Sequence, residues 1–144
     1  MAIDFDWLVI IDNAGTLVFG CKRTTKWSFE DIRLVLYNFL FTLRTFAKDL
    51  VLDQIKRIEM GNNQYILTQD ESKKFLFIVK CDRNADADLI KPILIEIKNN
   101  FVEKFVNYSS LTVSEKQNLI NSFMEDVKKI FQSFNLLDLE FLSV

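Results

Sequence analysis

The segment from Asp12 to Leu17 (DNAGTL) has the residue types that could do chemistry, and it follows a run from Phe5 to Ile11 that is apolar except at Asp6. An aspartate at the end of a buried strand can attack phosphorus when a second carboxylate and a divalent cation assist it. The segment holds no second carboxylate, because Asn13, Ala14, Gly15 and Thr16 follow Asp12. A structural alternative exists, because Asn and Gly tolerate positive φ and an Asp side chain bonds locally. We favour this alternative, and the segment predicts a hairpin turn.

This segment resembles the nucleophile loop of haloacid-dehalogenase-like phosphatases, in which an apolar strand is followed by Asp-x-Asp-Gly-Thr-Leu. The resemblance implies that Asp12 is the nucleophile and that magnesium binds beside it, whereas Ala14 stands at the acid–base position of that family. The family also has a helix after the loop, but residues 16–21 predict a strand. We therefore do not expect phosphatase activity.

Other catalytic and metal-binding patterns are equally incomplete. The chain has no histidine, so it offers no imidazole base or metal ligand. Its two cysteines, Cys21 and Cys81, consequently lack the usual activating partner. Asp82, Asp86 and Asp88 lack the glycine and the distal glutamate of a calcium loop, so helix capping explains them better. The sequence predicts a protein that is not an enzyme and needs no cofactor or metal.

Composition and charge narrow the class further. The chain has 144 residues, which fits one domain, and 49% of them are apolar. Its net charge of -2 disfavours nucleic-acid binding. The longest apolar run, Trp7 to Ile11, is too short to cross a bilayer. No leader-like segment opens the chain, and two thiols in apolar strands indicate a reducing compartment, so we expect a cytoplasmic protein.

Periodicity predicts an α+β chain that begins with a hairpin and ends with two helices. The expected strands are 5–11, 16–21, 55–60, 64–69 and 75–81, and the expected helices are 28–50, 86–110 and 112–134. The first and fifth strands are apolar at nearly every position, so they should lie in the centre of the sheet. We divide the chain into a domain at 1–135 and a tail at 136–144, which either docks on the surface or adds a short strand.

This order of elements resembles the longin domain of the SNARE-like superfamily. The hairpin from Phe5 to Gly15, the long helix from Ser28, and the strands Tyr65–Leu67 and Phe75–Val79 carry the resemblance. Clathrin-adaptor small chains and trafficking-complex longin subunits look similar in length and layout. The resemblance implies a five-stranded antiparallel sheet in the order 2-1-5-4-3, as in a longin or profilin-like sandwich. Helix 1 would cover one face, and helices 2 and 3 the other.

The resemblance also implies a function in protein interaction. Members of the superfamily are usually non-catalytic, pair with another longin or roadblock domain, and hold small GTPases or trafficking partners. We expect the same here, including a homodimer and, at most, peripheral membrane association through a complex. One alternative is a profilin-like domain that senses a small molecule at a helix–sheet interface. Another is a roadblock-like GTPase regulator, although roadblock domains begin with a helix.

Two groups of residues are the candidates for partner binding. A second, short apolar stripe runs along the first helix, and a charged strand at 55–60 suits a sheet edge. The candidate residues are Arg33, Leu34, Tyr37, Phe41, Ile55, Arg57 and Glu59. They would bind a partner by β-augmentation along the edge or by helix-to-helix contact. The alternative for the helix stripe is contact with the tail or with a loop of the same chain.

Overall fold

The structure, a computed structural model, describes residues 4–23, 27–47, 55–70, 72, 74–136 and 138–142, with only the backbone described for 39–47. Within these residues the chain is α+β, with one antiparallel sheet and three α-helices. The elements are β1 (Trp7–Asp12), β2 (Leu17–Arg23), α1 (Phe29–Ala47), β3 (Lys56–Met60), β4 (Asn63–Gln69), β5 (Phe75–Asp82), α2 (Ala87–Lys104), a 3₁₀ turn η1 (Tyr108–Ser110), α3 (Val113–Gln132) and β6 (Leu139–Phe141).

The sheet has six strands in the order β3-β4-β5-β1-β2-β6. The prediction of five strands is therefore wrong, although the five predicted strands are neighbours in the predicted order 2-1-5-4-3. The tail supplies the sixth strand, which pairs antiparallel with β2. Two ion pairs hold it there, Lys22 Nζ to Glu140 Oε2 at 2.8 Å and Arg23 Nε to Asp138 Oδ2 at 2.8 Å. Of the two alternatives for the tail, the structure contains the added strand.

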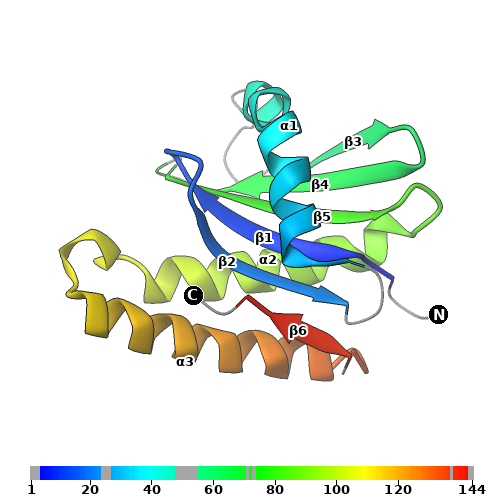
Figure 1. The fold of residues 1–144 in the computed structure, drawn as a ribbon. Coiled ribbons are helices and arrows are strands. Elements are labelled where there is room, and N and C mark those ends of the chain that lie inside the picture. The colour runs from blue at the N-terminus through cyan, green and yellow to red at the C-terminus, as the bar shows by residue number, and fades with distance from the viewer. Residues whose placement is uncertain are drawn as a thin grey trace.

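Helices cover both faces of the sheet (Figure 1). On β1, Trp7 and Val9 belong to the apolar cluster that includes Ile32 of α1. The alternate residues Leu8 and Ile10 belong to the cluster formed with α2 and α3. Side chains of a strand point alternately to the two faces, so a strand buried on both sides is apolar at nearly every position. This explains why β1 is a continuous apolar run.

Aromatic rings fill the space between the sheet and the α2–α3 pair. The ring centroid of Phe101 on α2 lies 4.0 Å from that of Phe105 and 5.3 Å from that of Phe123 on α3. Phe77 of β5 meets Phe101 edge-on at 5.4 Å, and Phe19 of β2 meets Phe123 edge-on at 4.8 Å. Such pairs add about 0.5–1.5 kcal/mol each to the burial of apolar area. Many of the 14 phenylalanines therefore join the two helices to the sheet.

The β1–β2 connection is the predicted hairpin turn. One carboxylate oxygen of Asp12 accepts the backbone N–H groups of Ala14 at 2.9 Å and Thr16 at 2.8 Å. Gly15 has φ of 87°, which a residue with a side chain rarely adopts. Asp12 thus organises a turn that leads directly into an antiparallel strand.

The predicted caps are also present. Asp86 caps α2 by accepting the N–H of Asp88 at 3.0 Å. Thr112 and Glu115 form the predicted capping box at the start of α3. Within the residues that the structure describes, no helix is long and apolar enough to cross a membrane.

Candidate interaction surfaces on α1 and β3

The outer face of α1 is set by the spacing of its apolar residues. Ser28 Oγ accepts the N–H of Asp31 at 3.1 Å and so starts the helix. Ile32 and Leu36, four residues apart, are 0% and 7% exposed and pack on the sheet. Helical periodicity turns Arg33, Leu34 and Tyr37 away from the sheet, whereas Val35 packs against the same cluster as Ile32. We define the α1 outer face as Arg33, Leu34 and Tyr37.

Two large apolar side chains of this face are exposed. Leu34 is 56% exposed and Tyr37 is 85% exposed. The predicted alternative, contact with the tail or a loop, is therefore not realised for Tyr37 within the described residues. The side chain of Phe41, the third member of the predicted stripe, lies outside the described residues.

A buried ion pair lies next to the start of α1. The ammonium group of Lys80 on β5 donates to the Asp6 carboxylate, and the two side chains are 2% and 9% exposed. The Lys80 nitrogen also lies 4.4 Å from the ring centroid of Trp27, which precedes α1. The ammonium is buried and the indole is half-buried, and a cation over an indole contributes roughly 0.5–2 kcal/mol. This contact ties Trp27, two residues before α1, to the centre of the sheet.

The same row of the sheet holds two further aromatic groups. Trp7 lies opposite Lys80 on β1, and its ring centroid is 6.1 Å from that of Tyr65 on β4. Burial, together with the nearby Asp6 carboxylate, raises the pKa of the Tyr65 hydroxyl. The buried indole nitrogen of Trp7 has no hydrogen-bond partner among the described residues. The side of the sheet that faces α1 is thus a densely packed layer against which α1 lies.

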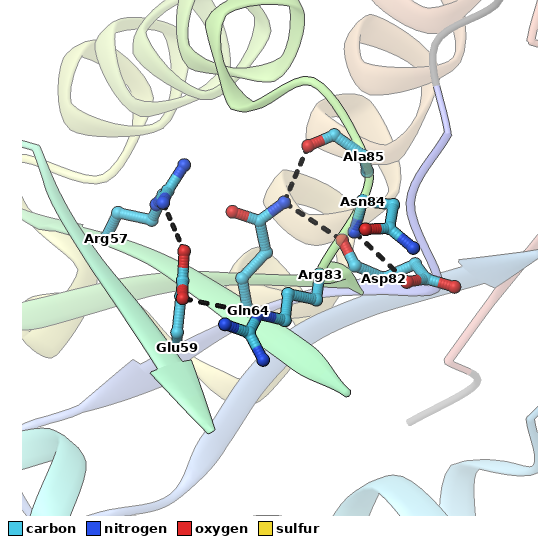
Figure 2. A network of polar contacts seen from close by, with 7 residues as sticks. All are labelled: Arg57, Glu59, Gln64, Asp82, Arg83, Asn84 and Ala85. Atoms are coloured by element: carbon cyan, nitrogen blue, oxygen red, sulfur yellow. Dashed lines mark hydrogen bonds and ion pairs between the residues drawn. The ribbon is translucent and has the colours of Figure 1, made fainter. Parts of the chain in front are cut away.

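The second surface is β3, which lies at the edge of the sheet. Within the described residues it pairs only with β4. Arg57 and Glu59 are exposed on this strand and form an ion pair. Arg83, from the turn after β5, reaches the other oxygen of Glu59 at 3.4 Å, so Glu59 lies between two guanidinium groups (Figure 2). We call Lys56–Met60 the β3 edge.

Gln64 of β4 holds the β5–α2 turn beside the β3–β4 hairpin. Its amide nitrogen donates to the carbonyl oxygens of Asp82 at 2.9 Å and Ala85 at 2.7 Å (Figure 2). The backbone N–H of Arg83 donates to Asn62 in the β3–β4 turn at 2.9 Å. These bonds fix the turn that presents Arg83 to Glu59. Gln64 is fully buried, and its carbonyl oxygen has no partner among the described residues.

The structure does not bring the two predicted groups together on one surface. Arg57 pairs with Ile66 across β3–β4, and Ile66 belongs to the α2–α3 cluster, so the side chains of Arg57 and Glu59 point to that side of the sheet. Ile55, half-buried, packs against the same cluster. The α1 outer face lies on the other side. The chain therefore has two separate candidate surfaces.

A groove opens between the C-terminal half of α2 and the β4–β5 connection. It has a volume of about 500 Å³, and its lining includes Phe75, Lys98, Val102, Phe105 and Val106. Lys98 is buried and lies 3.5 Å from Thr68 Oγ1. Asp70 accepts the N–H of Phe75 at 2.9 Å. The buried polar groups of this groove are thus engaged with the chain itself.

Both cysteines are buried and chemically suppressed. Burial raises the pKa of the Cys21 thiol far above its ordinary value. Burial, followed by the charge of Asp6, raises the pKa of Cys81 to about 12. Neither thiol is therefore a ready nucleophile near neutral pH. In the described part of the chain, no three acidic or thiol side chains cluster closely enough to hold a metal ion.

No family model matches the chain, and no curated protein matches it.

Sequence reasoning missed Lys80, Asp6, Gln64 and Arg83. Lys80 carries a recognisable signal, because it is a charged residue between apolar neighbours in a strand. Gln64 carries little signal, because it follows Asn62 and Asn63 near the start of its strand. A buried lysine needs a counter-charge, but which residue supplies it depends on the strand register. Arg83 gives no such signal, since an arginine in a turn is ordinary.

Proposed function

We propose that this chain is a non-catalytic interaction scaffold of longin type that binds a protein partner through the α1 outer face. The observation that carries the proposal is the exposure of Leu34 and Tyr37, which are 56% and 85% exposed on a helix whose opposite side packs on the sheet. Tyrosines of this kind are enriched in the energetically important centres of protein interfaces. A buried face fixes the helix, and the free face offers a rigid apolar anchor.

The architecture supports the longin-type assignment. The neighbours β3-β4-β5-β1-β2 have the order that the longin resemblance implies, and α1 is the helix that covers one face among the described residues. The sixth strand, β6, is a departure, and it extends the sheet at the end opposite β3. The departure leaves α1 and β3, the two candidate surfaces, unchanged.

The local chemistry supports a non-catalytic role. The Asp12 carboxylate is committed to the hairpin turn, where it accepts two backbone N–H groups. The chain has no histidine, and the pKa of each cysteine is raised by burial. The partner classes that we propose are a small GTPase or another longin or roadblock domain, with the chain in the cytoplasm and any contact with membranes made through the complex.

A matched pair of surface variants tests the proposal. Tyr37→Asp places a charge in the α1 outer face, and Val113→Asp places the same charge at an equally exposed apolar position on α3, where Val113 is 86% exposed. Proteins recovered with the purified chain from its own cells would be identified by mass spectrometry. We expect Tyr37→Asp to lose a specific partner that the wild type and Val113→Asp retain. Equal recovery with all three proteins would contradict the proposal.

The groove beside α2 favours one second candidate, the small-molecule sensor. Its volume of about 500 Å³ falls in the range of ligand pockets, roughly 300–1,000 Å³. Val102→Trp would fill it from the α2 side. Native mass spectrometry of the purified protein would reveal a bound molecule that this variant loses. The roadblock-like alternative has no comparable observation in its favour.

A further inference from the structure

The backbone of β3 determines which of its groups are free to pair outward. Met60 and Asn63 pair across a two-residue turn in which Gly61 has φ of 62°, so the pair that closes this hairpin is hydrogen-bonded. Hydrogen-bonded and non-hydrogen-bonded pairs alternate along an antiparallel ladder. Lys56, Ile58 and Met60 therefore direct their backbone groups toward β4. Arg57 and Glu59 direct theirs outward.

The charges on this edge distinguish between the possible ways in which it could pair with itself. Two copies of one strand related by a two-fold axis run antiparallel. An axis at Arg57 or at Glu59 places that charged side chain opposite its own copy, and such like-charge pairs are destabilising. An axis at Ile58 places Arg57 opposite Glu59 of the second copy, and Glu59 opposite Arg57. This register also aligns the outward-directed backbone groups of both strands.

We propose that two copies of this chain join through their β3 edges, antiparallel, with Ile58 on the two-fold axis. The inference rests on the proposed function in that it names a partner for one surface of the scaffold, a second copy of the chain. Charge complementarity selects that partner, since Arg57-Ile58-Glu59 is its own complement when reversed. The α1 outer face lies on the other side of the sheet from Arg57 and Glu59 and stays available for a different protein.

The pairing gives the exposed charges new partners across the interface. Arg57 and Glu59 of different copies occupy hydrogen-bonded pairs, and each pair exchanges two backbone bonds. Glu59 already lies between Arg57 and Arg83 in one chain, so the second copy adds another guanidinium to an ordered carboxylate (Figure 2). Ile58 meets its own copy in a non-hydrogen-bonded pair, where Cα atoms are about 4.5 Å apart.

Charge variants test the register by sedimentation analysis. In the proposed register, Arg57→Glu places a glutamate opposite a glutamate in both cross-strand pairs. Glu59→Arg places an arginine opposite an arginine in both pairs. We expect each to weaken dimerisation at least tenfold, since each cross-strand pair changes by about 1 kcal/mol. Two samples restore opposite charges across the interface and should dimerise like the wild type. One is an equimolar mixture of the two single variants, and the other is the double variant Arg57→Glu/Glu59→Arg alone. Circular dichroism would check that every variant is folded.

A disulfide test locates the axis independently of charge. Ile58→Cys should form a dimer across the axis under mild oxidation, because non-hydrogen-bonded pairs have the Cα separation of a disulfide. Met60→Cys is the matched control on the same strand, since its opposite residue in the second copy is Lys56. We expect rapid crosslinking for Ile58→Cys and little for Met60→Cys.

Three outcomes would overturn the proposal: a wild type that stays monomeric at high concentration, single charge variants that dimerise like the wild type, or equal crosslinking at the two cysteine positions. None of these would remove the proposed function, because partner binding by the α1 outer face is measured separately with Tyr37→Asp. A dimer that Tyr37→Asp abolishes, and that the β3 variants leave intact, would place self-association on α1 instead.

Discussion

The buried pair of Lys80 and Asp6 makes a quantitative prediction about stability. Asp6→Asn removes the negative charge and leaves the Lys80 ammonium, 2% exposed, without its counter-charge. Lys80→Met leaves the Asp6 carboxylate without its counter-charge and also removes the cation over Trp27. Breaking a buried ion pair from one side costs about 3–5 kcal/mol, whereas replacing both members costs much less.

Free energies of unfolding for the wild type, both single variants and the double variant would be measured by urea denaturation followed by far-ultraviolet circular dichroism. We expect each single variant to lose about 3 kcal/mol or more. The double variant should be more stable than additivity predicts, by at least about 2 kcal/mol. A domain of this kind has roughly 5–15 kcal/mol of stability, so these losses are measurable.

The exposed pair of Glu125 and Lys128 on α3 is the matched control. Its nitrogen–oxygen distance is 3.1 Å, and its side chains are 62% and 41% exposed. A coupling of about 0.5 kcal/mol or less is expected there. Additive losses for Asp6→Asn and Lys80→Met, within about 0.5 kcal/mol, would refute the reasoning that the buried pair acts as a unit.

Three further stability predictions follow from the helices, the core and the buried thiols. Thr112→Ala removes the α3 cap and should cost about 1 kcal/mol in urea denaturation. Phe123→Ala leaves a cavity among the aromatic rings and should cost about 3–5 kcal/mol by the same assay. Because burial raises the pKa values of Cys21 and Cys81, the folded state keeps both thiols protonated while the unfolded state loses protons above the ordinary pKa of 9.0. The contribution of the two thiols to the free energy of unfolding is complete below pH 9. Above pH 9 it should fall by about 1.4 kcal/mol per pH unit for each thiol. The double variant Cys21→Ala/Cys81→Ala should lack this slope.

The centre of the sheet could be predicted from the sequence because two strands are apolar on both faces. The runs that become β1 and β5 have no polar side to expose, so they must lie between two layers of helices. The hairpin turn at Asp12 and the capping box at Thr112 were equally predictable, since both depend on residues within a few positions of each other.

The sixth strand illustrates what local patterns leave undecided. Three residues, Leu139–Phe141, are too few for a reliable period, and the interactions that hold them come from far along the chain. Lys22 bonds Glu140, and Arg23 bonds Asp138, across more than 100 residues. The same limit applies to Lys80 and Asp6, whose pairing depends on the register of β1 with β5.

The candidate residues were partly predictable for the same reason. Helical spacing alone places Leu34 and Tyr37 away from Ile32 and Leu36. The side of the sheet to which Arg57 and Glu59 point depends on the β3–β4 register, which the sequence does not state. The sequence therefore left open how the two groups lie relative to each other, and the structure places them on opposite sides of the sheet.

Photo-crosslinking from position 37 tests the central claim, binding of a protein through the α1 outer face, most directly. A photoreactive phenylalanine analogue would replace Tyr37, or Val113 as the control, in the chain expressed in its own cells. Both side chains are highly exposed, at 85% and 86%, so they sample solvent equally. We predict a discrete crosslinked protein from position 37 that position 113 does not give. The same pattern of products from both positions, or none from either, would contradict the claim.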